Sequence, residues 1–546
     1  MPQPCFALRL ISSGLLLLSL LSSVSARATE AAWRYGVKPG DTLFSIASDY
    51  LQRPDQWRRL QTLNAVDDPL RLMPGTQLQL PVALLKREAA AAVVLDVQGQ
   101  VMRLSAKQPR QSLTVGQQLH AGDTVETGAD ATVSLRFVDG SRLLLTPLSS
   151  MTLTRLVLLG KSGIAQTWLA LNRGGIDTRV AQQHKPVGHY EIKSRALNLA
   201  VRGTDFRAFV SENDQVSRGE VMEGTVLAAG GRGPRLALRA GFGTQASPGA
   251  PAQAPRALPP APDLGGTATL LHRVPLRLDW AASPEAVRYR AQVFADRSLE
   301  KLLLDGVFAS PSAKWADLPD GRYVLRVRAI DAQGFEGLNA EREFVLKARP
   351  EPPAIQAPQD GQKSYGPQAL LRWTASTLAS AYRVQVAASP DFANPLTDAT
   401  DLSRNEHAVT LAPGAYHWRV AAIAPQQGQG PFSDTQAFTQ RPIPESPQAD
   451  APQVDDRLLS FSWRAGEAGA KYQIQLARDA DFNQVLMDRV LDTPQTQIER
   501  PEPGLYFMRI KTIDADGFAG PFGAAQRFEV PVTPPWWLLL LLPLAL

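Results

Sequence analysis

The sequence predicts a mainly β, multidomain chain, and three observations lead to this prediction. The chain has 546 residues, which is enough for several domains. Its 43 prolines and 40 glycines favour turns and short connections over long helices. Much of its length alternates apolar and polar residues with period two, as half-buried strands do. A helical period is clear only in a short segment near the start of the chain.

Residues 1–28 resemble a secretory signal peptide. Arg9 supplies a positive start, residues 10–21 form the apolar run, and small residues offer cleavage after Ala26 or Ala28. An uncleaved anchor helix is the alternative, although the run is short for a bilayer that requires about 20 residues. The single cysteine, Cys5, precedes this run. The exported chain would therefore have no disulfide and no thiol nucleophile.

The charge of the chain does not indicate a nucleic acid partner. It has 57 Lys and Arg against 52 Asp and Glu, a formal net charge of +5. Residues 86–239 carry 20 basic and 13 acidic residues, so this region is the most basic part. Two interpretations stay open, a weak attraction to anionic polymer or lipid and an ordinary solvated surface.

Residues 33–81 read as a compact unit with two strands and two helices. We expect a strand over 33–37, a turn at 38–40, a helix capped by Asp41 or Thr42, a second helix over 56–63 and a strand over 77–80. The residues expected to face the core of this unit are Leu43, Ile46, Ala47 and Tyr50 in the first helix and Trp57, Leu60 and Leu63 in the second.

This unit resembles the LysM domain. The matching residues are Gly40-Asp41-Thr42-Leu43, Ile46-Ala47, Leu60, Asn64, Pro74-Gly75, Leu78 and Leu80-Pro81. The resemblance implies binding of glycans that contain N-acetylglucosamine, chiefly peptidoglycan, in a groove between two loops. The implied groove residues are Gly40, Asp41, Thr42, Leu43, Phe44, Leu72, Met73, Pro74 and Gly75. Tight turns with glycine expose backbone groups that can pair with sugar amides and hydroxyls, and we expect Leu43 and Met73 to cover the N-acetyl methyl. The alternative is that these residues only cap helices and close turns.

Residues 93–230 are expected to form short strands separated by Gly and Asp-Gly turns. They resemble the FecR-type periplasmic domain. The residues that carry the resemblance are Gly99, Gly116, Gly122-Asp123, Thr127, Gly128, Leu135, Asp139-Gly140-Ser141 and Val201-Arg202-Gly203-Thr204-Asp205-Phe206. Members of that family usually place a membrane helix and a sigma-factor-binding segment ahead of this domain. Here a signal and a LysM unit precede it, so the resemblance implies the fold and a periplasmic setting rather than the signalling circuit. Arg202 and Asp205, on either side of Gly203, could form a ligand site or a local ion pair in a turn.

The C-terminal half of the chain repeats itself three times. Trp280, Trp373 and Trp463 are spaced by 93 and 90 residues, and a tyrosine follows each by nine residues. A Gly-x-Tyr unit then opens another alternating strand at Tyr323, Tyr416 and Tyr506. These units resemble fibronectin type III-like sandwiches over 263–348, 352–440 and 449–531. We expect the tryptophans and tyrosines to fill the cores, rather than to bind sugars.

Two segments outside these domains have a biased composition. Residues 241–262 are rich in Pro, Ala and Gly and read as a semi-extended linker. The tail 536–546 begins with Trp536-Trp537 and continues as a leucine run too short to span a bilayer. We expect it to enter one leaflet or an apolar groove of a partner, and the alternative is a piece of a longer span.

No constellation of residues indicates catalysis, a metal or a cofactor. The six histidines lack a zinc-binding spacing, and there is no Gly-x-Ser-x-Gly motif. We therefore expect a non-enzymatic, exported protein of the bacterial periplasm or cell envelope that binds peptidoglycan and offers its sandwiches to protein partners. A periplasmic sensor or regulator acting through the FecR-type domain is the first alternative. A cell-wall hydrolase with an unrecognised site is the second.

Overall fold

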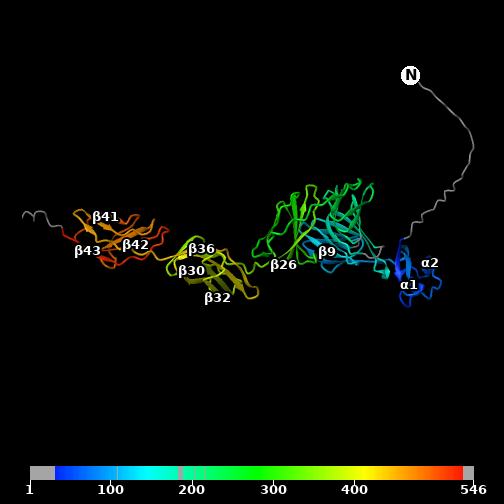
Figure 1. Ribbon diagram of the computed structural model, residues 1–546, viewed down its shortest axis with the longest axis horizontal. Coiled ribbons are helices and arrows are strands. Elements are labelled where there is room, and N and C mark those ends of the chain that lie inside the picture. The colour runs from blue at the N-terminus through cyan, green and yellow to red at the C-terminus, as the bar shows by residue number, and fades with distance from the viewer. Residues whose placement is uncertain (1–30, 107, 183–187, 202, 214, 533–546) are drawn as a thin grey trace, which may run out of the picture. The chain divides into compact units, whose positions relative to one another are not determined.

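The computed structural model describes residues 31–532, apart from 107, 183–187, 202 and 214. Strands dominate and short helices occur near the N-terminus, which confirms the predicted mainly β, multidomain fold (Figure 1). The chain divides into two compact units, one up to Leu346 and one from Lys347 onward. Within the described residues, no helix is long and apolar enough to cross a membrane. The predicted signal peptide and apolar tail lie outside the described residues.

The N-terminal module has the predicted order of strand, helix, helix and strand. Strands β1 and β2 pair antiparallel, with Trp33 opposite Leu80 and Tyr35 opposite Leu78. The elements are β1 (Ala32–Gly36), α1 (Leu43–Tyr50), η1 (Pro54–Gln56), α2 (Trp57–Asn64), β2 (Gln77–Pro81) and η2 (Val82–Leu84).

Helix α1 follows the sequence prediction, and α2 departs from it at one residue. The Thr42 and Ser45 side chains cap α1 reciprocally, and its predicted inner face is buried. In α2, Leu60 is fully buried and Trp57 is half-buried, but Leu63 is 48% exposed. The prediction that Leu63 faces the core was wrong. Leu60 and Asn64, four residues apart, share the face of α2 that is directed toward β2, and Leu63 lies beside this face. The Asn64 amide donates to Gln79 O at 3.0 Å and its Oδ1 accepts from Gln79 N at 2.6 Å, which ties the end of α2 to β2.

The second domain is a strand system that closes into a barrel. Its apolar core runs through the whole system from Ala92 to Ala246. The strands are β3 (Glu88–Ala89), β4 (Ala92–Gln98), β5 (Val101–Ser105), β6 (Gln108–Ser112), β7 (Gln118–Leu119), β8 (Thr124–Thr127), β9 (Thr132–Arg136), β10 (Arg142–Leu145), β11 (Ser150–Leu158), β12 (Ala165–Arg179), β13 (His189–Lys193), β14 (Leu197–Val201), β15 (Asp205–Val210), β16 (Ser217–Glu223), β17 (Thr225–Gly230), β18 (Leu236–Arg239), β19 (Phe242–Ala246) and β20 (Arg256–Ala257), with the turn η3 (Gly160–Ser162) between β11 and β12.

The barrel completes the core of the N-terminal module. Leu159 and Ile164, at the tip of the β11–β12 hairpin, are buried in the same cluster as Leu43 and Leu60. At the rim of this contact, Lys161 Nζ lies 2.9 Å from Asp49 Oδ1. The module therefore shares its core with the barrel instead of hanging from it on a flexible tether.

Residues 241–262, expected as a linker, partly belong to the barrel. Strand β19 pairs antiparallel with β16, and β20 pairs with β19. Thr244 Oγ1 donates to Gln253 O at 2.6 Å, and Leu258 is buried. The prolines of this segment lie outside β19, which is hydrogen-bonded to strands on both sides, so the overall composition concealed the strand.

Three β-sandwiches follow the barrel. The first has β21 (Leu270–Leu271), β22 (Leu276–Asp279), β23 (Arg288–Phe294), β24 (Leu302–Phe308), β25 (Ser312–Trp315), β26 (Gly321–Ile330) and β27 (Ala340–Leu346). The second has β28 (Ile355–Ala357), β29 (Gln362–Tyr365), β30 (Gln368–Trp373), β31 (Ala381–Ala387), β32 (Thr397–Leu402), β33 (Glu406–Thr410), β34 (Gly414–Ala424), β35 (Gly428–Phe432) and β36 (Gln436–Arg441). The third has β37 (Gln453–Val454), β38 (Leu458–Ser462), β39 (Lys471–Ala477), β40 (Val485–Leu491), β41 (Gln495–Glu499), β42 (Gly504–Ile513) and β43 (Gln526–Val530).

The repeated aromatic residues pack the sandwich cores, as predicted. In the second sandwich Trp373 is fully buried, and its ring meets Tyr382 edge-on with centroids 5.5 Å apart. The Tyr382 hydroxyl accepts from Ser376 N at 2.9 Å, and the Tyr416 hydroxyl donates to Ala412 O at 3.0 Å. The same Trp–Tyr contact and the same tyrosine hydrogen bonds recur in the other two sandwiches. These aromatics are therefore structural residues in all three repeats.

Candidate functional site

The fold brings the two predicted glycan loops together at one end of the β1–β2 pair. Val37, directly after β1, accepts from Gly75 N at 2.8 Å and donates to Thr76 O at 2.9 Å. Leu43 N, at the start of α1, donates to Pro69 O at 3.0 Å. The loop before α1 and the loop before β2 are thus fixed beside each other by backbone hydrogen bonds.

Asp41 and Thr42 hold the shape of the first loop. The Asp41 carboxylate accepts from Lys38 N and from the Tyr35 hydroxyl, both at 2.7 Å. Burial, followed by this bond to Asp41, raises the pKa of Tyr35 far above its usual value. The Thr42 side chain caps α1. Both polar side chains are therefore engaged in hydrogen bonds that hold the loop and the start of α1.

Gly40 and Gly75 occupy the conformations that make each turn. Their φ angles are 86° and 88°, in the left-handed region that favours glycine. A Cβ at either position would meet no atom within 4 Å, so backbone conformation rather than crowding requires glycine there. Both residues, like Pro74, are exposed and present main chain to solvent.

The apolar side chains at the loops divide into buried and exposed residues. Leu43 is fully buried in the module core, so it cannot cover a sugar methyl as the sequence suggested. Leu43 is the first residue of α1. It is next to the loop in sequence, but the helical period places its side chain on the buried face of α1. Phe44 is 55% exposed and Met73 is 78% exposed, whereas Leu72 is half-buried. Leu70, which sequence reasoning missed, is 71% exposed beside them.

Family models match two parts of the chain. Residues 35–81 match the LysM domain, and residues 123–227 match the FecR protein family. The chain carries a LysM domain and a FecR domain. Both families are typical of bacterial envelope proteins, and they are binding or regulatory rather than catalytic.

Some solved structures resemble parts of this chain, with low TM-scores and low sequence identity. The chicken CNTN1 FN1-FN3 domains are 19% identical, with 47% of this chain and 94% of that chain covered and a TM-score of 0.25. Two structures of a candidate anti-sigma factor from Parabacteroides distasonis are 11% and 12% identical, with 24% of this chain and 59% of each of theirs covered and TM-scores of 0.21. No curated protein matches the chain. Because these scores are low, the fibronectin type III-like fold of the repeats is judged from the order of their strands and the packing of their cores.

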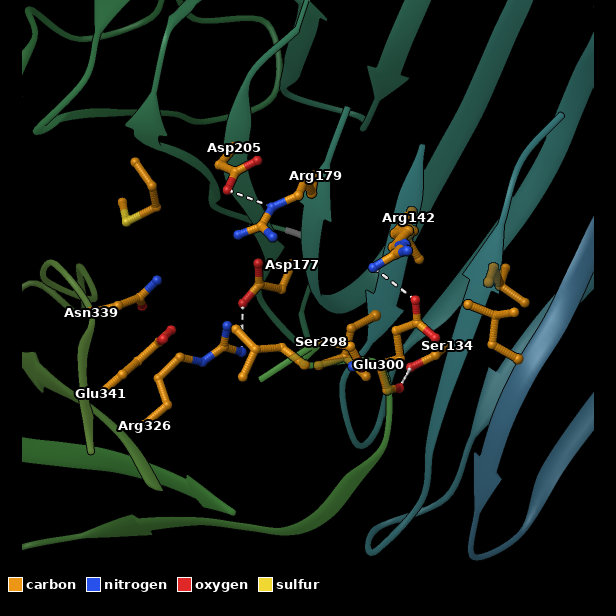
Figure 2. Close-up of a pocket in the computed structure, with 16 residues that line it drawn as sticks. Ser134, Arg142, Asp177, Arg179, Asp205, Ser298, Glu300, Arg326, Asn339 and Glu341 are labelled. Atoms are coloured by element: carbon orange, nitrogen blue, oxygen red, sulfur yellow. Dashed lines mark hydrogen bonds and ion pairs between the residues drawn. The ribbon is translucent and has the colours of Figure 1, made fainter. Parts of the chain in front are cut away.

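A second candidate site lies where the FecR domain meets the first sandwich. Asp177, at the end of β12, accepts from Arg326 at 2.9 Å and from Arg328 at 2.6 Å, and both arginines come from β26 of the sandwich. Figure 2 shows Asp177 bonded to Arg326 in the wall of a narrow crevice, whose volume is about 70 Å³. The crevice also contains the pairs Arg179–Asp205 at 2.9 Å and Arg142–Glu300 at 2.7 Å.

The charges at this interface are buried and paired. Arg207 of β15 lies 2.8 Å from Glu220 and donates to the carbonyls of Glu336 and Gly337 at 2.6 and 2.7 Å. Burial would raise the pKa of Glu336, but Arg290, Arg328 and Arg207 hold this pKa far below its usual range. Burial raises the pKa of Glu220 despite the charge of Arg207. Such a network fixes the register of two domains, because breaking one pair leaves a buried charge.

Sequence reasoning missed this interface. Asp177 lies 149 and 151 residues from its partners Arg326 and Arg328 in the chain, and the excess of basic residues in the FecR region does not include these two arginines. The candidate pair Arg202 and Asp205 is not described as such, because Arg202 lies outside the described residues. Asp205 instead accepts from Arg179 of the neighbouring strand β12 at 2.9 Å.

Proposed function

We propose that this chain is a non-enzymatic protein of the bacterial cell envelope that binds peptidoglycan through its LysM domain. The observation that carries the proposal is the juxtaposition of two glycine-bearing loops, with Phe44 and Met73 exposed between open stretches of main chain. Exposed backbone groups suit the amide and hydroxyls of an N-acetyl sugar, and the two apolar side chains suit its methyl and ring face. The FecR domain and sandwiches then serve as scaffold and interaction modules.

Co-sedimentation of the purified chain with peptidoglycan sacculi tests this proposal. The double variant Phe44→Asp/Met73→Asp places charge at the exposed loop positions without entering the core. We expect its apparent Kd for sacculi to rise at least about tenfold, a loss of roughly 1.4 kcal/mol in binding free energy. Leu63→Asp, on the exposed side of α2, is the matched control and should sediment like the parent.

Competition by soluble sugars defines the ligand. Chitin oligomers, which carry N-acetyl groups, should release the chain from sacculi, whereas cellulose oligomers of equal length should not. If the double variant sediments like the parent at equal melting temperature, the loops are not the binding site.

An envelope sensor or regulator is the second candidate function, favoured by the shared core of the LysM and FecR domains. Because Leu159 and Ile164 are buried against the LysM core, a change in the glycan-bound module would reach the FecR domain directly. Transcript profiles of a deletion strain, complemented with the parent or with Phe44→Asp/Met73→Asp, test this function. A regulator requires the two profiles to differ, and identical profiles would leave only the scaffold role.

A further inference from the structure

A second cavity, of about 220 Å³, lies between the FecR domain and the first sandwich and shares Asp177 in its lining with the crevice in Figure 2. The FecR domain lines it with residues of β12, β15 and β16, and the sandwich lines it with residues of β23, β24 and β26. Its size is below the range of pockets for drug-sized ligands, so it suits a small molecule.

The cavity has an excess of positive charge. Three of its five arginines are paired, Arg207 with Glu220 at 2.8 Å, Arg290 with Glu336 at 2.7 Å and Arg328 with Asp177 at 2.6 Å. The other two, Arg218 and Arg288, have no carboxylate within ion-pair distance among the described residues. Arg218 and Arg288 thus line the cavity without a direct ion-pair partner in the described part of the chain. Arg288 is exposed to solvent, and carboxylates at longer range act on Arg218.

Arg218 is held in place with a donor unused. Its guanidinium lies over the Phe209 ring at 4.6 Å, and its Nη1 donates to Gln333 O at 2.6 Å. Its Nε is buried and has no hydrogen-bond partner, which is unfavourable for a polar group. Burial lowers the pKa of Arg218, and the nearby carboxylates of Glu220, Glu336 and Asp331 oppose this effect without an ion pair to its guanidinium. An anion in the cavity would give this guanidinium a direct charged partner.

Gly334 makes room for this arginine. Its φ is 84°, and a Cβ there would overlap the Arg218 guanidinium. The remaining lining is partly apolar and includes Val307 and Ile330 of the sandwich. The cavity therefore combines a fixed cationic head with an apolar wall.

Two charged residues of the cavity wall, Arg328 and Glu336, are particular to the first sandwich. In the alignment of the three repeats on Tyr289, Tyr382 and Tyr472, Arg328 corresponds to Ala421 and Lys511. Glu336 corresponds to Gln429 and Ala519. By contrast, the bond from arginine to glutamine across neighbouring strands recurs in all three sandwiches, as Arg326–Gln292, Arg419–Gln385 and Arg509–Gln475. The charged pair Arg328–Glu336 is thus not a requirement of the sandwich fold, whereas the apolar Ile330 recurs as Ile423 and Ile513.

We propose that this cavity binds a small organic oxyanion, a carboxylate or a phosphate ester, whose charged group pairs with Arg218 and Arg288. The apolar part of the ligand packs against Val307 and Ile330. The planar guanidinium of arginine matches both oxyanions, and the apolar wall selects an organic ligand over an inorganic ion.

Isothermal titration of the purified full chain tests the proposal with benzoate and phenyl phosphate as probes. Benzamide is the neutral control, and inorganic phosphate and acetate lack the apolar body. We expect at least one aromatic anion to bind with Kd below about 1 mM, and benzamide to show no binding. The tighter of the two anions identifies the source of the oxyanion. If neither aromatic anion binds at about 10 mM, or if benzamide binds as well, the proposal is overturned.

Variants locate the binding within the cavity. Arg218→Gln/Arg288→Gln should weaken binding at least about tenfold, whereas Arg322→Gln, an exposed arginine on β26, should leave it unchanged. Val307→Phe, at a position that is 43% exposed, fills the cavity without disturbing the core and should also abolish binding. Binding that survives Val307→Phe in a folded protein would place the anion elsewhere. This result is independent of sacculus binding, which both variants should retain.

Discussion

The Arg328 guanidinium lies 2.6 Å from the Asp177 carboxylate, and this bond joins the first sandwich to the FecR domain. Burial alone would raise the pKa of Asp177, but Arg326 and Arg328 lower it below its usual value. Arg328 itself is 3% exposed. Two domains that appear separate in the sequence therefore share one buried ionic contact, and this contact explains why both fall within one compact unit.

Removal of the shared carboxylate should separate the FecR domain from the first sandwich. Asp177→Ala leaves Arg326 buried without a carboxylate partner and leaves Arg328 with Glu336 alone, and we expect a loss of about 3–5 kcal/mol in the unfolding free energy of this unit. Urea denaturation of residues 29–346 measures this loss. Asp279→Ala removes an exposed pair with Arg277 in the same sandwich and should cost less than about 1 kcal/mol. Equal losses in the two variants would contradict the ionic contact.

Leu159 should stabilise the LysM domain from outside its own sequence. Leu159→Ala removes a fully buried side chain from the LysM core, and we expect a cost of about 2–5 kcal/mol. Hydrogen exchange should become faster in α1, which packs against the hairpin tip. Leu148→Ala, at a position that is 46% exposed in the same domain, serves as the control. Unchanged exchange in α1 after Leu159→Ala would mean that the LysM domain stands on its own core.

The second sandwich should depend on its buried tryptophan. Trp373→Ala should lower the unfolding free energy by about 3–5 kcal/mol, because the indole is fully buried against Tyr382. Thermal unfolding of residues 347–532 provides the measurement. Leu370→Ala, on the same strand and 41% exposed, should change it little. A Trp373→Ala protein that melts normally but loses binding to a sugar would show that the residue is a binding platform.

Asp398 should give the second sandwich an acid-sensitive contribution to stability. Hydrogen bonds from Arg383, at 2.6 and 2.7 Å, are the main cause that lowers the pKa of Asp398 to about 2. Because the folded pKa lies below the usual value near 3.9, the contribution is complete above about pH 5 and is lost as the pH falls toward 2.

The variant Asp398→Asn isolates this contribution. The pair is partly exposed, so we expect the parent to exceed the variant by about 1 kcal/mol at pH 6, and by much less at pH 2.5. Urea denaturation of residues 347–532, followed by tryptophan fluorescence, measures both differences. A difference that is constant with pH would show that the carboxylate does not titrate through this interaction.

Local rules predicted the parts of the molecule that depend on neighbouring residues. The α1 cap at Thr42, the buried face with Leu43 and Ile46, and the sandwich cores around Trp280, Trp373 and Trp463 all follow from spacing within short segments. Spacing alone could not decide whether the Leu43 side chain is buried in the core or exposed at the glycan loop, because Leu43 stands where the loop ends and α1 begins.

Contacts between distant segments could not be read from the sequence. Leu159 looks like any apolar strand residue, yet its partner is a domain that precedes it in the chain. Asp177, Arg326 and Arg328 carry no local pattern, and their pairing depends on how the FecR domain and the sandwich pack. The proline-rich composition of residues 241–262 concealed a strand whose stability comes from β16.

Strand β12 has a mechanical consequence. Its first residue, Ala165, follows the hairpin tip that is buried in the LysM core, and Asp177 near its end holds the first sandwich. Fifteen residues of extended chain span up to about 50 Å. If the LysM domain is fixed to the cell wall, a pull on the first sandwich runs along this one strand. The hydrogen bonds between β12 and its neighbours β11 and β15 would then be loaded in shear, so many of them would have to break together. The barrel, and not a loop, would therefore bear the tension between the cell wall and the first sandwich.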